Sequence, residues 1–224
     1  QSGVDEHFCK PLSRSEVQIR MSVASRAIDL QKRFYSEDGQ LPEDLKALTR
    51  DMRAMTQFQA SQLPKRGSEV QGISIDYFWI PKLFVSGDLF NVLQLNDQWV
   101  AFYMLDVVGH GVPAALKAIE LSRLLSTHPQ EGVLLEMDFS GYSSRIRMPS
   151  EVMSLLNNRY QMRNETDSFF AIAYGLFNLH TGDVTLALAG SPAPLYQDLD
   201  DQLHELGGSS FPIGVTEDGQ YTDI

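Results

Sequence analysis

The stretch that decides the fold runs from Ser86 to Leu125, SGDLFNVLQLNDQWVAFYMLDVVGHGVPAALKAIELSRLL. Residues Trp99 to Leu105 are almost all aromatic or aliphatic, a length and composition that suit a buried β-strand. We expect this strand to stop at Asp106, because a buried carboxylate without a cationic partner is costly. The sequence therefore predicts that Asp106 points out of a strand end.

A second carboxylate, Asp88, follows Phe84 and Val85 and is expected to end a similar segment. A hairpin through Asn96 and Asp97 would return the chain and place the two carboxylates near each other. Two close carboxylates cannot both stay ionised without a cation. Oxygen ligands favour hard ions such as Mg²⁺ or Mn²⁺. The alternative is that both are ordinary turn aspartates.

A tight turn and a helix are expected after this hairpin. Gly109, His110 and Gly111 leave no room for bulk, and Pro113 suits the first turn of a helix. Apolar positions at helical spacing extend that helix over Val112 to Ser126.

Composition excludes several classes of protein. At 224 residues with 43% hydrophobic content, the chain can bury one full core behind a helical lead-in. The net charge of -11 argues against a nucleic-acid partner. A single cysteine, Cys9, excludes an internal disulfide and fits the reducing cytoplasm. The longest apolar runs, Trp99 to Leu105 and Phe169 to Phe177, are too short to cross a membrane.

The order of several motifs resembles that of the metal-dependent (PPM-type) serine/threonine phosphatases, in their bacterial SpoIIE-like branch. Ser86 replaces the first glycine of the usual pattern, which is a small departure. The resemblance covers roughly Met55 to Val215. It rests on SGD before an aromatic hairpin, DVVGHGVPAAL, QASQLP at 59–64, PSEVMSLLN at 149–157 and FFAIAYGLFNLHTGDVTLALAGSPAPLY at 169–196.

This resemblance implies an α+β fold, the PPM-type α/β/β/α sandwich. It also implies two Mn²⁺ or Mg²⁺ ions held by Asp88, Asp106 and the backbone carbonyl of Val107. His110 either protonates the leaving seryl oxygen or only shapes its turn. The implied substrate is a phosphorylated protein, typically an anti-sigma-factor antagonist. The alternative is a pseudophosphatase adaptor that binds a sigma factor or another regulatory partner without hydrolysis.

The first residues resemble the end of a response-regulator receiver domain. GVDEHFCKP places Lys10 where it would pair with a receiver phosphoryl group, and Ser13 and Glu16 form a helix-starting capping box. The resemblance implies bacterial two-component signalling, whereas the alternative is a plain turn before a helix. We expect a receiver end over residues 1–30, a helical linker over 31–58 and the phosphatase domain over 59–224.

The predicted linker carries apolar residues at a spacing of four, three, four and three: Leu41, Leu45, Leu48, Met52 and Met55. This spacing indicates a short heptad seam. Its role would be a homodimer contact or a signalling rod between the two modules. The alternative is an amphipathic helix packed on its own domain.

The later chain is expected to hold an irregular segment, a helix and a hairpin. The segment Thr127 to Met148 reads as a loop or lid, Ser150 as the cap of the next helix, and residues 169–177 and 183–189 as paired strands. The resemblance implies two late metal aspartates, but no hydrophobic strand precedes GVTEDG at 214–219. We therefore assign no metal role to Asp218 or Asp223 and expect a C-terminally incomplete domain.

Overall fold

The computed structural model describes most of the chain after the first 42 residues, over the ranges 43–81, 84–128, 132–137, 144–162, 168–208 and 210–224. Two compact units divide the chain, Gln1–Asp51 and Met52–Ile224. The predicted receiver end at residues 1–30, with Cys9 and Lys10, lies outside the described residues.

Helix α2 spans Glu43–Ala60, with Glu43 and Asp44 in its first turn, where carboxylates suit the helix dipole. It agrees with the helix predicted over the second half of the linker. Along the seam Leu48 is 54% exposed, whereas Met52 and Met55 are half-buried. A role for this seam in dimerisation stays a prediction.

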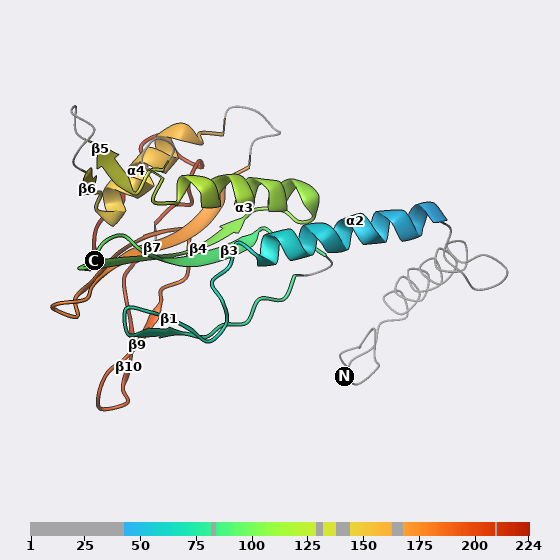
Figure 1. Cartoon of the computed structure of the whole chain (residues 1–224). Coiled ribbons are helices and arrows are strands. Elements are labelled where there is room, and N and C mark those ends of the chain that lie inside the picture. The colour runs from blue at the N-terminus through green and yellow to red at the C-terminus, as the bar shows by residue number, and fades with distance from the viewer. Residues whose placement is uncertain (1–42, 82–83, 129–131, 138–143, 163–167, 209) are drawn as a thin grey trace, which may run out of the picture. The chain divides into compact units, whose positions relative to one another are not determined.

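A four-stranded antiparallel sheet forms the centre of the second unit (Figure 1). Its order is β3-β4-β7-β8, with bounds Asp88–Gln94, Trp99–Val107, Phe170–Asn178 and Val184–Ala189. Both predicted hairpins are confirmed. In the first, the side-chain oxygen of Asn96 accepts the backbone N–H groups of Gln98 and Trp99 at 2.9 and 2.8 Å.

The predicted strand ends at the two aspartates are wrong in detail. Asp88 begins β3 rather than ending a segment, and β4 continues through Asp106 to Val107. The reason is the alternation of side chains along a strand. Val107 is 1% exposed on the covered face, while Asp106 lies on the opposite face and is exposed. A carboxylate is tolerated within the strand because its side chain leaves the core.

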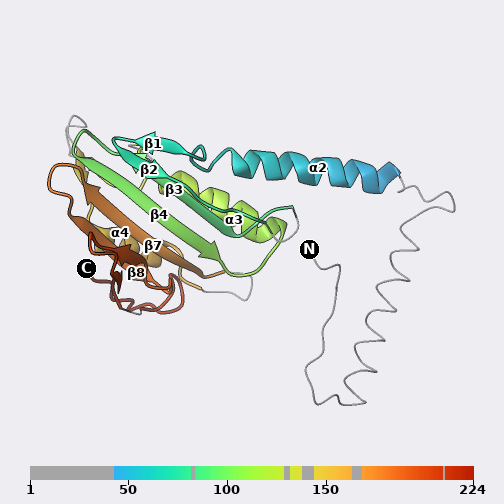
Figure 2. The same ribbon diagram turned by 90° about the horizontal axis from the view of Figure 1, so that it is seen from below.

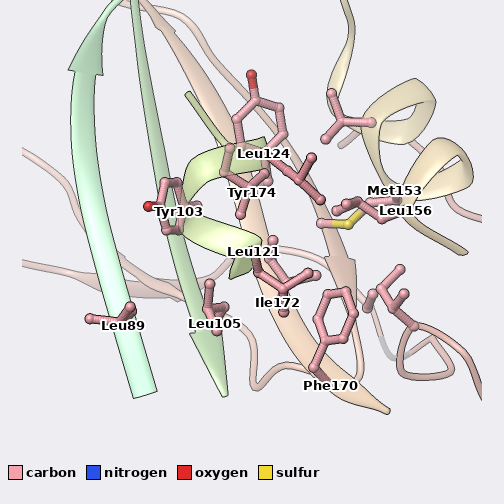
Figure 3. Packing of buried hydrophobic residues seen from close by; sticks show 14 of the residues in the cluster. Leu89, Tyr103, Leu105, Leu121, Leu124, Met153, Leu156, Phe170, Ile172 and Tyr174 are labelled. Atoms are coloured by element: carbon pink, nitrogen blue, oxygen red, sulfur yellow. The ribbon is translucent and has the colours of Figure 1, made fainter. Parts of the chain in front are cut away.

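Two helices cover one face of the sheet (Figures 1 and 2). Helix α3 spans Val112–Leu124 and packs over β3 and β4, and α4 spans Pro149–Arg159 and packs over β7 and β8. Alternate strand residues meet the helices in one hydrophobic core (Figure 3). Its largest buried members include Leu89, Leu105, Leu121, Met153, Leu156, Phe170, Ile172 and Tyr174.

The start of α4 differs from the prediction that Ser150 caps it. Met148 is the N-cap residue and Pro149 takes the first helical position, which its fixed backbone suits. The Glu151 carboxylate accepts the Met148 N–H at 2.7 Å. Ser150 instead donates its backbone N–H and its hydroxyl to the carboxylate of Asp223, at 2.7 and 2.8 Å.

The segment expected to be an irregular loop or lid contains a short hairpin, β5 at Leu135–Met137 and β6 at Ser144–Ile146. Arg145 on β6 ties this hairpin to the domain. Its guanidinium lies 2.9 Å from Glu136 on β5 and 2.8 Å from Glu151 on α4. These ion pairs join residues that lie apart in the sequence, so the local sequence pattern did not predict the hairpin.

The other face of the central sheet carries two short hairpins (Figure 1). They are β1 at Ser68–Val70 with β2 at Ile73–Ile75, and β9 at Leu195–Gln197 with β10 at Leu203–Glu205. Met104 of β4 points to this face and is 62% exposed. The predicted mixed α and β architecture is confirmed, with one helical layer on the central sheet. None of the described helices is long and apolar enough to cross a membrane.

Candidate functional site

The two predicted metal-binding aspartates lie directly opposite each other. Asp88, the first residue of β3, is the register partner of Asp106 on β4. Both are exposed, and they share the face of the sheet away from α3 and α4. Directly opposed side chains of antiparallel strands lie about 5 Å apart at their β-carbons, so the two carboxylates can share one ion.

The pair is electrostatically unfavourable by itself. Partial burial, the neighbouring charge of Asp88 and a hydrogen bond with that carboxylate together raise the pKa of Asp106. Like charges at this separation disfavour full ionisation unless a cation lies between them. The same geometry that is costly without a metal therefore favours a divalent cation.

Ser86 and Trp79 hold Asp88 in place. The hydroxyl of Ser86 donates to Asp88 Oδ2 at 2.8 Å and accepts the Asp88 N–H at 3.1 Å. The indole N–H of Trp79 donates to the Asp88 carbonyl at 3.1 Å. The serine that departs from the usual glycine thus positions the carboxylate.

A buried glutamine at the end of α2 supports Ser86 in turn. Gln59 is fully buried, donates from Nε2 to the Ser86 carbonyl at 2.6 Å, and accepts the Ser86 N–H at 3.0 Å through Oε1. Thr56, one turn earlier, donates its hydroxyl to the carbonyl of Phe84. Buried amides need such partners. The QASQLP motif therefore acts here as a clamp on the strand that carries Asp88.

Gly87 allows the Val107 carbonyl to lie close to the aspartates. A β-carbon added at Gly87 would lie 2.6 Å from the Val107 oxygen, which is closer than real contacts allow. The Val107 N–H also donates to the Gly87 carbonyl at 3.3 Å. The backbone carbonyl predicted as a third ligand thus packs beside the residue preceding Asp88.

His110 lies exposed in the turn between β4 and α3. Gly109 and Gly111 adopt φ values of 101° and 76°, the left-handed region that favours glycine. This geometry agrees with the predicted tight turn. Within the described part of the chain, His110 has no hydrogen bond that fixes its ring. Its proposed role in proton transfer stays a prediction.

The donors at the site fit a hard cation. Two carboxylates and one carbonyl are all oxygen ligands, the class that Mg²⁺ and Mn²⁺ prefer. Over the described residues, no group of three or more His, Cys, Asp and Glu side chains forms a larger candidate metal cluster. Asp223 is engaged by Ser150 instead. The structure therefore groups the predicted ligands Asp88, Asp106 and Val107, and no further acidic residue joins them in the part of the chain that the structure describes.

A second buried amide, that of Asn157, ties the end of α4 to the segment that pairs with the start of β7. Asn157, 1% exposed at the end of α4, donates to the Thr216 carbonyl at 2.9 Å and accepts the Gly214 N–H at 2.8 Å. Neighbouring Ile213 pairs with Phe170, the register partner of Val107. Gln59 and Asn157 stood in the motifs that carried the resemblance, but no role was predicted for them. The sequence signal that could have indicated their role is a polar residue at the end of an apolar helical pattern.

A family model described as Stage II sporulation protein E (SpoIIE) matches residues 96–224. The chain belongs to the SpoIIE family.

Two curated relatives of this SpoIIE-family chain come from Bacillus subtilis (strain 168). Phosphoserine phosphatase RsbP is 26% identical over 149 residues, which are 66% of this chain and 34% of RsbP. Phosphoserine phosphatase RsbU is 22% identical over 164 residues, which are 73% of this chain and 44% of RsbU. The chain thus spans less than half the length of either relative.

A solved structure supports the fold. The SiaA-PP2C domain of Pseudomonas aeruginosa superposes with a TM-score of 0.59 at 22% identity, covering 81% of this chain and 68% of that one. The predicted SpoIIE-like PPM domain is confirmed at the level of family and fold. The receiver resemblance stays a prediction, because the family match begins at residue 96.

Proposed function

We propose that this SpoIIE-family domain is a metal-dependent phosphatase that hydrolyses phosphoserine or phosphothreonine in a protein. The observation that carries the proposal is the cross-strand pair of Asp88 and Asp106 beside the Val107 carbonyl. The names of RsbP and RsbU, both phosphoserine phosphatases, support the reaction class.

In this mechanism Asp88, Asp106 and the Val107 carbonyl would hold Mn²⁺ or Mg²⁺. When bound, the ions supply a water of lowered pKa and neutralise phosphate oxygens. Ser86 orients the Asp88 carboxylate, and Gln59 holds Ser86, so the ligands are preorganised. With a net charge of -11, the protein repels a phosphorylated substrate unless cations receive it.

His110 completes the proposed set of catalytic residues, Asp88, Asp106 and His110. Its exposed position on a glycine turn after β4 leaves the ring accessible to the leaving seryl oxygen, to which it would donate a proton. The alternative, that it only shapes the turn, predicts that replacing it leaves the pH profile of turnover unchanged.

The proposed substrate and control follow from the sequence motifs. A phosphorylated anti-sigma-factor antagonist would be the substrate, and a receiver preceding α2 would regulate turnover in the bacterial cytoplasm. The α2 helix would carry the signal, because its last turn holds Gln59 against Ser86.

An adaptor function has one observation in its favour. Within the described residues, the site contains two carboxylates and no larger acidic cluster. A pseudophosphatase of the same fold would then bind a sigma factor or another regulatory partner without hydrolysis.

The test is turnover of a phosphoserine protein by the full-length natural protein, titrated with Mn²⁺ and Mg²⁺. We expect turnover that depends on metal and stops with a chelator. Capture of the partner with no turnover at any metal concentration would favour the adaptor and overturn the phosphatase.

A further inference from the structure

A polar groove lies on the helix-covered side of the sheet, where α3, the end of α4 and the residues before β7 meet. Its volume is about 610 Å³. The residues that matter below are Val108, Leu116, Lys117, Glu120, Arg159 and Tyr160.

The groove begins at the candidate catalytic turn. Val108 lies two residues after Asp106 and lines the groove. Its N–H donates to the Phe169 carbonyl at 3.2 Å, which fixes this wall against the start of β7. Because the aspartates lie on the other face of the sheet, a peptide segment bound in the groove would have to pass the turn at residues 109–111 to reach them.

Among the described residues that line the groove, the one acidic group, Glu120, is already paired. Lys117 Nζ lies 3.2 Å from Glu120, and the Tyr160 hydroxyl donates to the same carboxylate at 2.8 Å. Although burial opposes it, these hydrogen bonds from Tyr160 and Lys117 lower the pKa of Glu120, so it stays charged and paired. Lys117 also lies 4.1 Å from the centre of the Tyr160 ring.

Arg159 is the exposed cation of the groove, and its charge also acts on Glu120 and Tyr160. Its side chain is exposed, and its guanidinium carbon lies 5.9 Å from the centre of the Tyr160 ring. Among the residues that the structure describes, no carboxylate forms an ion pair with it. Val108 and Leu116, 43% and 55% exposed, offer apolar surface in the same groove.

We propose that this groove binds the segment of the phosphoprotein that flanks the phosphoserine, with Arg159 receiving an acidic side chain of that segment. The inference rests on the proposed phosphatase function and adds a substrate preference to it. Lys117 and Tyr160 hold Glu120, which forms no ion pair with Arg159 among the described residues, and Val108 and Leu116 contact the intervening residues of the bound segment. Arg159 is thus a specificity-determining residue, because it selects an acidic flank and takes no part in phosphoryl chemistry.

The experiment uses the full-length protein and phosphoserine peptides that carry one glutamate at successive flanking positions, each matched by a glutamine peptide. The readout is the ratio of kcat/KM for the two members of each pair. At one position we expect a preference for glutamate of about threefold to fivefold, the size of an exposed charge pair. Arg159→Gln should remove this preference, and Arg159→Glu should reverse it in favour of a lysine peptide.

Arg53→Gln, an exposed arginine of α2 outside the groove, is the matched control and should keep the preference. Equal rates for glutamate and glutamine peptides at every position, or a preference that survives Arg159→Gln, would overturn the groove assignment while the phosphatase assignment stands. If neither the peptides nor the phosphoserine protein are hydrolysed, the phosphatase proposal fails. Anisotropy of the labelled peptides then tests the groove alone, by whether tighter binding of one glutamate peptide is lost in Arg159→Gln.

Discussion

The side chain of Gln59 bonds both backbone groups of Ser86, across 27 positions of the sequence. This clamp joins the end of α2 to the residue whose hydroxyl orients Asp88. The candidate metal site is therefore held by the helix that precedes the domain as well as by its own hairpin.

Replacing Gln59 by alanine should destabilise the domain and weaken metal binding. Two hydrogen bonds to a buried amide are lost, so the free energy of unfolding should fall by about 2 to 3 kcal/mol. Urea unfolding and Mn²⁺ titration measure the two effects. Gln57→Ala, at an exposed position of the same helix, is the control and should change neither. Unchanged Mn²⁺ affinity in Gln59→Ala would show that the clamp does not position Asp88.

Gly87→Ala should also disturb the site, because the new β-carbon would meet the Val107 oxygen at 2.6 Å. Moving that backbone apart should cost about 1 to 3 kcal/mol of stability and reduce Mn²⁺ affinity. Gly208→Ala is the matched control, since its β-carbon would meet nothing within 4 Å. Equal urea midpoints for the two variants would contradict the close approach.

The stability of the metal-free protein should depend on Asp106 in a particular direction. Its pKa is raised above 3.8 in the folded state, so the folded protein binds more protons than the unfolded chain in the window above that value. Stability should then fall as pH rises through the raised pKa. Urea midpoints in a chelator check this. Asp106→Asn should flatten that part of the profile, whereas Asp97→Asn, in the turn of the same hairpin, should keep it.

In the full-length protein, Asp106→Asn should remove most Mn²⁺-dependent turnover. We expect a loss of at least about a hundredfold, the order found when one electrostatic group of an active site is deleted. Asp218→Asn is the control, because this exposed aspartate is assigned no metal role. The measurement is the turnover rate of each variant at saturating Mn²⁺. A near-normal rate for Asp106→Asn would show that this residue does not belong to the proposed site.

Receiver control, if α2 carries it, should depend on the heptad seam. The double variant Leu48→Asp and Met52→Asp should abolish the change in turnover caused by the phosphoryl mimic beryllofluoride while leaving the domain folded, because a signal needs two packings of the helix. Ala47→Asp and Ala54→Asp, at exposed positions of the same helix, form the matched control. An activation ratio that survives in the seam variant would make the seam merely structural.

Local pattern was a good guide wherever neighbours in the chain decide the structure. The apolar run of residues 99–105, the Asn96 turn and the glycines around His110 predicted the hairpin, the facing aspartates and the tight turn into α3. Local pattern was less accurate for the first and last residues of helices and strands. Asp88 begins its strand and Met148 caps α4, because cross-strand pairing and a reaching Glu151 side chain decide these boundaries.

By itself the sequence determined the order of the four central strands and the helices α3 and α4, the two carboxylates and the resemblance to the SpoIIE-like branch, since these depend on residue types and their spacing along the chain. Only the tertiary structure decided which distant groups meet. Gln59 reaches Ser86, Asn157 reaches Gly214 and Thr216, and Lys117 and Tyr160 satisfy Glu120 beside Arg159. The physical reason is that a buried polar group takes whichever partner packing brings within about 3 Å, and the chemical identity of a residue does not specify that partner.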